Sequence, residues 1–226
     1  MIAQMSLYIY LLLTIHKLHF MPVSVDQLFK ALKLKYEGPF KWNEKLKANY
    51  NGVYIITLTE DPKDKSKNKF QFALCPDTFK RWLIEANDLE IQGKKVNKIK
   101  DVKKYLEQFW NPNENILYIG ESSSQTNPLE KRINQFYVHK VEQKGPHTGG
   151  FWLKLLPCLK DTFIYYAKVE RPRETEFKLI MKFVELSTTK EFYDLDNFSK
   201  YFPFANLKVD IMKDHEIRNH TNKNFR

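Results

Sequence analysis

The sequence contains few cysteines and no pattern of them that would form disulfides or bind zinc. Cys75 and Cys158 are the only two, and they are far outside the close spacing at which paired cysteines bind a metal. Two thiols are also too few for the disulfide framework of a small secreted domain. This scarcity excludes a cysteine-stapled scaffold and favours a reducing, cytoplasmic setting.

A long apolar run is also missing. The apolar stretch at residues 7–15 is shorter than the roughly 20 residues that span a bilayer, and no basic residue precedes it as in a secretory signal. We therefore expect no membrane partner; the alternative is a basic protein that attaches to membranes through residues 7–15. Met21 is followed directly by a helical pattern, which raises the hypothesis that residues 1–20 reflect the choice of start site.

Acidic residues are outnumbered by basic ones. The 226 residues include 37 Lys and Arg against 27 Asp and Glu, a formal net charge of +10. Such a balance favours a polyanionic partner, because binding releases the counterions of the polyanion. Nucleic acid is the first candidate and an anionic membrane surface the second. The length and the apolar content of 42% suffice for one main core with additions.

Apolar patterning predicts both strands and helices. The predicted strands are residues 52–58, 115–120 and 163–170, with a further one at 70–75. The predicted helices are residues 24–34, 77–86, 101–110, 128–141 and 174–186.

A basic segment separates the first two main strands. Residues 62–104 contain twelve Lys and Arg against six Asp and Glu, a net charge of +6. A solvated surface explains this charge as well as a DNA-contacting lobe does. In the second interpretation, Lys94, Lys95 and Lys98 are the candidates for contacts with DNA.

Four residues are unusual for the elements that contain them. Glu176 lies one turn before the apolar stripe of its helix, and a carboxylate that faces a core needs a partner or a metal. Arg132 lies at the edge of another apolar stripe, where a guanidinium can extend to solvent or hold a phosphate. Tyr54 and Tyr118 bring hydroxyls into otherwise aliphatic strands. Each has an ordinary structural explanation when taken alone.

Together these residues resemble the GIY-YIG nuclease family. Gly52-Val53-Tyr54 is similar to the first motif, with Val in place of Ile, and Tyr118-Ile119-Gly120 matches the second motif literally. Arg132 resembles the arginine of the family's first helix, and Glu176 resembles its metal-binding glutamate. Pro203-Phe204-Ala205-Asn206 is similar to the closing element. The five elements occur in the family's order.

The resemblance implies a divalent-metal-dependent endonuclease that hydrolyses double-stranded DNA. Glu176 would bind one Mg²⁺ or Mn²⁺, and Arg132 would hold the scissile phosphate. Tyr54, helped by Tyr118, would orient or deprotonate the attacking water. Since free tyrosine has a pKa of about 10, a role as base implies a lowered pKa or a hydrogen-bonded relay. Asn206 would hold the site together by hydrogen bonds.

The resemblance also implies a fold and a division of the chain. The fold class is α+β, with a small mixed sheet of three core strands flanked by helices, an N-terminal helical arm and a basic inserted lobe. We expect the arm over residues 1–46 and the catalytic domain over residues 47–210, with the insert at 60–112. A basic tail would occupy residues 211–226.

Three features of the sequence differ from the family's pattern. The two tyrosines are 64 residues apart, from 54 to 118, where the family has a much shorter connection. Phe136 occupies a position at which many members have His or Tyr. Tyr137 and His139 lie beside it, and the pattern leaves open whether one of them substitutes. His147 lies in a glycine-containing loop at residues 145–150, where it could contact phosphate or cap the turn. These three residues are the auxiliary candidates.

The chain has no recognisable zinc finger, helix-hairpin-helix or helicase segment, which favours a sequence-specific type II restriction enzyme within the family. Such an enzyme would act as a homo-oligomer, since one active site cuts one strand. The alternatives are a repair-type or homing-type nuclease of the same family, and a catalytically silent nucleic-acid-binding module.

Overall fold

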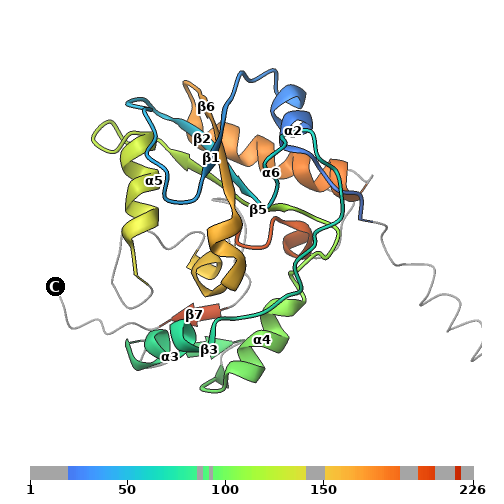
Figure 1. Ribbon diagram of the computed structural model, residues 1–226, viewed down its shortest axis with the longest axis vertical. Coiled ribbons are helices and arrows are strands. Elements are labelled where there is room, and N and C mark those ends of the chain that lie inside the picture. Colours follow the sequence, from blue (N-terminus) through green and yellow to red (C-terminus); the bar gives the residue numbers. More distant parts are fainter. Residues whose placement is uncertain are drawn as a thin grey trace, which may run out of the picture.

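A four-stranded antiparallel sheet forms the centre of the protein. The computed structural model (Figure 1) describes residues 20–85, 89–91, 94–140, 151–188, 198–206 and 217–219. The sheet has the strand order β1-β6-β2-β5. Its strands are β1 (Glu37–Lys41), β2 (Gly52–Thr57), β5 (Ile116–Ser122) and β6 (Phe163–Lys168). The α+β class is confirmed, but the sheet has four strands instead of the expected three, and its pairs are antiparallel rather than mixed.

Both faces of this sheet are buried, which explains why β2 is buried throughout and mostly apolar instead of alternating. Helix α6 (Pro172–Thr188) covers one face, where it packs on Val53 and Ile55. Helix α5 (Leu129–Val138) covers the other face, on which Tyr54 and Tyr118 lie. Figure 1 shows α5 and α6 on opposite sides of the strands. Both helices agree with their predicted ranges to within three residues at each end.

The N-terminal segment belongs to the core in its described part. Helix α2 (Val25–Ala31) begins after Ser24, whose hydroxyl accepts a hydrogen bond from the Gln27 amide at 3.2 Å, and it buries its apolar side in the same cluster as α6. Strand β1 then pairs with β6. The expected helical arm is therefore only partly correct, because residues 37–41 form a strand of the sheet.

The basic insert forms a second group of elements at one end of the molecule (Figure 1). It contains the helices α3 (Pro76–Glu85) and α4 (Ile99–Glu107). Its short strands β3 (Leu89–Ile91) and β4 (Lys94–Lys95) form a sheet with β7 (Ile217–Asn219) in the order β4-β3-β7. The strand predicted at residues 70–75 is wrong, because this segment is irregular.

Three short 3-10 helices complete the described chain, at Phe151–Leu155, Pro157–Asp161 and Phe198–Tyr201. None of the helices in the described ranges has the length and the apolar content needed to span a membrane.

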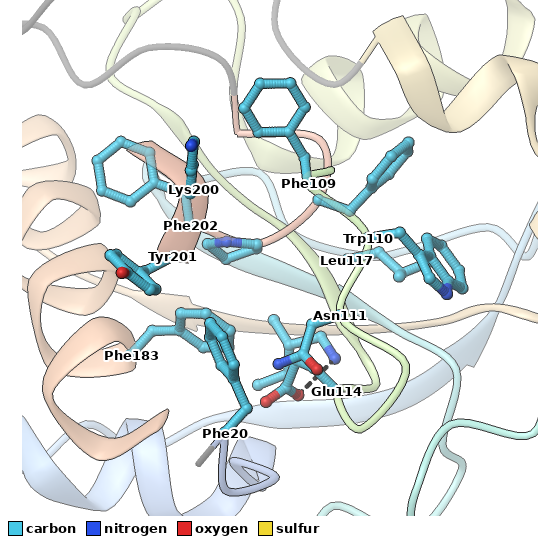
Figure 2. A pocket seen from close by; sticks show the side chains of 13 residues that line it. Phe20, Phe109, Trp110, Asn111, Glu114, Leu117, Phe183, Lys200, Tyr201 and Phe202 are labelled. Atoms are coloured by element: carbon cyan, nitrogen blue, oxygen red, sulfur yellow. Dashed lines mark hydrogen bonds between the residues drawn. The ribbon is translucent and has the colours of Figure 1, made fainter. Parts of the chain in front are cut away.

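A buried carboxylate fixes the beginning of β5. Glu114 is 4% exposed and accepts hydrogen bonds from the backbone amides of Val23, Asn115 and Ile116 at 2.8–3.0 Å. It borders a cavity of about 10 Å³ among aromatic side chains (Figure 2), which is room for about one water molecule. Glu114 thus joins the N-terminal segment to the end of β5 that is remote from Gly120.

The stability of the protein should depend on pH through Glu114. Burial raises the pKa of this carboxyl to about 7, against the opposing effect of its three amide donors. Because the folded state holds this proton more tightly than the unfolded state does, the contribution is fully present below about pH 4.5. It is lost as the pH rises to about 7, at a cost on the order of 3 kcal/mol.

Urea unfolding at about pH 5 and about pH 8 measures this effect, with Glu114→Gln as the comparison. We expect a smaller fall in the free energy of unfolding between the two pH values for the variant than for the wild type. An equal fall in both proteins would show that Glu114 does not titrate in this range.

Candidate active site

The two tyrosines of the motifs lie side by side on neighbouring strands. In the register of the sheet, Tyr54 of β2 is opposite Gly120 of β5. The ring centroids of Tyr54 and Tyr118 are 5.8 Å apart and their planes are tilted by 56°. Both side chains are buried, with exposed fractions of 0% and 6%. Antiparallel pairing of β2 with β5 therefore brings together two motifs that are 64 residues apart in sequence.

Gly120 makes this arrangement sterically feasible. A Cβ atom at this position would lie 2.6 Å from Cε1 of Tyr118, 2.6 Å from Cζ of Tyr54 and 2.7 Å from the Tyr54 hydroxyl oxygen. The two rings thus occupy the space that any other residue would fill with its side chain. The glycine of the second motif is needed for the packing of the tyrosines rather than for a turn.

Arg132 and Glu176 come from helices on opposite faces of the sheet, and both affect the two tyrosines electrostatically. Burial raises the pKa of Tyr54 well above its ordinary value; the Arg132 guanidinium lowers this pKa, and the Glu176 carboxylate raises it. Burial also raises the pKa of Tyr118, and the same two charges act on it in the same directions. The fold therefore brings all four groups near enough to interact electrostatically.

The raised pKa of Tyr54 bears on its expected role. The hydroxyls of Tyr54 and Tyr118 are near enough to affect each other's pKa, but they do not meet in hydrogen-bonding geometry. The buried Tyr54 hydroxyl oxygen has no hydrogen-bond partner within the described chain. A tyrosine with a raised pKa remains protonated at neutral pH. The hydroxyl can thus donate a hydrogen bond, whereas the lowered pKa that a tyrosine base would need is not found.

Helix α5, which carries Arg132, is held at both ends. At its beginning, the Leu129 amide donates to the carbonyl of Tyr50 at 2.9 Å, and the Glu130 carboxylate accepts from the Ala48 amide at 3.2 Å. At its end, the Lys154 ammonium donates to the carbonyls of Phe136 and, at 3.1 Å, Tyr137. The Leu129 amide and the carbonyls of Phe136 and Tyr137, which have no partner within the helix, are thereby hydrogen-bonded.

Asn206 forms a pair of hydrogen bonds with the second motif. Its side-chain oxygen accepts from the Ile119 amide at 2.8 Å, and its side-chain nitrogen donates to the Ile119 carbonyl at 2.7 Å. The Ala205 amide also donates to the Leu117 carbonyl at 2.8 Å. The turn at residues 204–206 thus binds to the outer edge of β5, and Asn206 fixes the residue between Tyr118 and Gly120.

The auxiliary candidates are placed differently from one another. The ring of Tyr137 packs edge-on against Trp42, with the ring centroids 4.9 Å apart, and its buried hydroxyl has no hydrogen-bond partner in the described part of the chain. Burial raises the pKa of Tyr137, and the charges of Glu44 and then of Tyr54 raise it further. His139 is buried at the end of α5. His147 lies outside the described residues. Tyr137 is thus the candidate that the structure relates electrostatically to Tyr54.

The three lysines expected to contact DNA are exposed. Lys94 and Lys95 form β4, and Lys98 directly precedes α4. In Figure 1, α4 lies at the opposite end of the molecule from the beginning of α5. A nucleic acid that contacts both these lysines and Arg132 would therefore have to extend across the protein.

Sequence reasoning missed one residue near the tyrosines. Glu121 follows Gly120 in β5, and its carboxylate raises the pKa of Tyr54. One of its oxygens accepts from the Ser123 hydroxyl at 3.3 Å, whereas the other is buried without a hydrogen-bond partner among the described residues. The predicted strand at residues 115–120 ended one residue before Glu121, whereas β5 continues to Ser122. No group of three or more metal-binding side chains occurs among the residues that the structure describes.

Comparison with known proteins identified no relative. The sequence matches no family model and no curated protein, and the structure matches no solved structure.

Proposed function

We propose that this protein is a divalent-metal-dependent endonuclease that hydrolyses phosphodiester bonds of double-stranded DNA. One observation carries the proposal: Tyr54 and Tyr118 are neighbours on one face of the sheet, and Arg132 and Glu176 act on both hydroxyls. A guanidinium can stabilise charge on a phosphate, a carboxylate can bind a metal ion, and tyrosine hydroxyls can hydrogen-bond to the attacking water. Together these groups can support hydrolysis of a phosphodiester.

The residues fit a divalent cation of the Mg²⁺ or Mn²⁺ type. Such ions prefer carboxylate oxygens, and Glu176 supplies one carboxylate near the tyrosines. The buried hydroxyl of Tyr54 lacks a partner in the described chain, so this polar atom is available to a water ligand of the ion. When bound, the ion would lower the pKa of a water and stabilise charge on the phosphate.

The chain's own residues would perform the remaining tasks. Arg132 would hold the phosphate through the planar fork of its guanidinium. Tyr54, whose pKa is raised, would act as a protonated donor that orients the attacking water, and Tyr118 would keep the Tyr54 ring in place. Asn206 would fix the strand that carries Tyr118 through its two hydrogen bonds with Ile119.

Incubation of the purified protein with several plasmids and Mg²⁺ tests the proposal. We expect discrete linear fragments that EDTA prevents, since restriction-type cleavage is the activity that we infer. A ladder of nicked products would favour a repair-type or homing-type nuclease. Binding without any cleavage would favour the silent nucleic-acid-binding module and would overturn the proposal.

Replacement of Tyr54 by Phe should reduce cleavage with little effect on stability. The substitution removes one hydroxyl that has no hydrogen-bond partner in the described chain, so the free energy of unfolding should change by about 0.5 kcal/mol or less. Loss of the donor to the attacking water should lower kcat about 100-fold. Single-turnover cleavage and urea unfolding measure the two effects.

Tyr165→Phe is the matched control for this variant. Tyr165 lies on the neighbouring strand β6 and belongs to the cluster on the α6 face, where its hydroxyl donates to the Glu60 carbonyl. We expect a loss of stability and normal cleavage. Normal cleavage by Tyr54→Phe would instead remove Tyr54 from the mechanism.

The basic insert can be tested by the salt dependence of DNA binding. If Lys94, Lys95 and Lys98 bind phosphates, their replacement by Gln should flatten the plot of log K against log salt concentration. The slope should change by about 0.9 for each phosphate that the variant no longer neutralises. Fluorescence anisotropy with a labelled duplex, measured at several salt concentrations, gives the slope. An unchanged slope would identify these exposed lysines as a solvated surface.

A further inference from the structure

A duplex that is cut at Arg132 would need further cations on either side of the scissile phosphate. Contacts with neighbouring phosphates are what fix the register and orientation of a duplex on a protein. The basic insert lies at the opposite end of the molecule from the beginning of α5 (Figure 1). The cations that hold the DNA next to the active site should therefore come from chain that lies closer to α5.

A strap of chain, residues 41–50, lies along α5 and leads from the end of β1 toward β2. At the beginning of α5, the helix is hydrogen-bonded to Ala48 and Tyr50 of the strap. At the end of α5, Trp42 contacts two rings of the last turn edge-on, with centroid distances of 4.9 and 5.5 Å. Figure 1 shows the strap beside the helix. The strap thus follows the whole length of α5, which is about 15 Å for ten residues.

The strap presents three exposed lysines, Lys41, Lys45 and Lys47. None of them forms a salt bridge with a carboxylate of the described chain. The one acidic residue of the strap is Glu44, and its carboxylate accepts a hydrogen bond from the Lys41 backbone amide at 2.9 Å. The ammonium groups are therefore available to an anion outside the protein.

Lys168 adds a fourth cation near the beginning of α5. It is exposed at the end of β6, and its ammonium lies 5.4 Å from the centroid of the Tyr50 ring. In the sheet it is opposite Gly52, where a Cβ atom would lie 2.6 Å from the Leu129 side chain. Paired residues project to the same face, so Lys168 projects to the face that α5 covers. Arg132 follows Leu129 by less than one turn of helix.

We propose that the strap and Lys168 form the surface that binds the phosphate backbone of duplex DNA next to the active site. The inference rests on the proposed function and deepens it, because it identifies what holds the substrate. A 15 Å length of duplex has about nine phosphates, which is enough for these four lysines and Arg132. Because the strap is joined to both ends of α5, phosphates bound to it would be fixed relative to the guanidinium.

The salt dependence of duplex binding tests this inference. We would replace Lys41, Lys45 and Lys47 together by Gln and measure the fluorescence anisotropy of a labelled duplex in EDTA, which prevents cleavage. We expect weaker binding at low salt and a flatter plot of log K against log salt concentration. The slope should change by about 0.9 for each phosphate contact that is lost.

A matched control removes the same charge from the other face of the sheet. Lys33 and Lys35 follow α2, which packs in the cluster of α6, and Lys63 follows Pro62, whose carbonyl accepts from the Asp26 amide of α2. All three lysines are exposed. Their joint replacement by Gln should leave the slope of the wild type unchanged. Equal flattening in the two triple variants would show an effect of net charge alone and would overturn the inference.

A second measurement uses the unaltered protein, in case a variant does not fold. A duplex added in EDTA should protect Lys45, Lys47 and Lys168 from acetylation, as measured by mass spectrometry, while Lys33 and Lys35 remain reactive. Unchanged acetylation of the first three lysines, or binding of anionic vesicles but not of the duplex, would overturn the inference. Plasmid cleavage by a protein without this protection would contradict the inference alone. Protection without cleavage would contradict the nuclease proposal instead.

Discussion

Glu176→Gln is expected to abolish cleavage while DNA binding survives. The change removes the negative charge at the proposed metal site but retains nearly the same volume. We expect kcat to fall by more than about 1000-fold, which corresponds to ~4 kcal/mol of transition-state stabilisation. The side chain is half-buried at the beginning of α6, before the buried part of the helix, so the fold should tolerate an amide there. Single-turnover cleavage and duplex binding measure the two properties.

The same helix offers a control for Glu176. Glu174→Gln removes a carboxylate of equal charge two residues earlier, where it is exposed and paired with Lys178 and Arg171. Surface pairs of this kind contribute little to stability, and this one lies outside the proposed site. Cleavage should therefore be normal in Glu174→Gln. Equal loss of DNA binding and of folding in Glu176→Gln would show a structural role for this residue.

Gly120→Ala should damage both the stability and the activity of the protein. The added methyl group would lie within 2.7 Å of atoms in the side chains of Tyr54 and Tyr118, and both rings are rigid and buried. Overpacking of a well-filled core costs about 1–3 kcal/mol. The rings can escape only by moving away from β5, which would displace the Tyr54 hydroxyl. Cleavage should fall about as far as in Tyr54→Phe, or further.

A double-mutant cycle identifies the cause of this effect. In a Tyr54→Leu background, the ring carbon and the hydroxyl oxygen of Tyr54 that would crowd the new methyl group are absent. The cost of Gly120→Ala should therefore be smaller there than in the wild type. Equal costs in both backgrounds, measured by urea unfolding, would contradict steric pressure on Tyr54 as the cause.

The sequence allowed much of this core to be predicted because the residues concerned are either strongly periodic or special. The helix that carries Glu176 has a clear apolar stripe, and the all-apolar run before Leu58 can only be a buried element. The resemblance assigned Tyr54 and Tyr118 to one site. The observed register, with Tyr54 opposite Gly120, brings the two motifs together on neighbouring strands.

Strand β1 was missed because its sequence opposes a strand assignment. Glu37-Gly38-Pro39 contains two strand-breaking residues, and only pairing with β6 makes this segment a strand. Its exposed side chains show no alternation that could reveal it. An edge strand of this kind depends on a partner that is distant in sequence, so local patterning cannot detect it.

The segment at residues 70–75 shows the opposite error. Phe72 and Leu74 are buried while their neighbours are less so, an alternation that is typical of a strand. The described backbone nevertheless joins no sheet, and the Cys75 amide donates to the Leu155 carbonyl instead. Alternation indicates which side chains are buried, whereas a strand also needs a neighbour with free backbone groups.

The chemistry of the site was less predictable than its location. The sequence left open whether the pKa of Tyr54 is lowered, and burial in the assembled core raises it. Glu121 was not among the predicted site residues, because its proximity to Tyr54 depends on how β5 packs. Both properties arise from packing between elements that are far apart in sequence.

The two outer strands of the main sheet bear on how copies of this protein could associate. At β5, the amide and carbonyl of Ile119 are already bonded to Asn206, and the Leu117 carbonyl is bonded to Ala205. At β1, Pro39 has no amide hydrogen to offer, and the register is interrupted between Glu37 and Phe40. Both borders therefore resist the addition of a strand from another molecule. A homo-oligomer that cuts both DNA strands would have to join through helices or side chains, and the same protection should limit aggregation through the sheet.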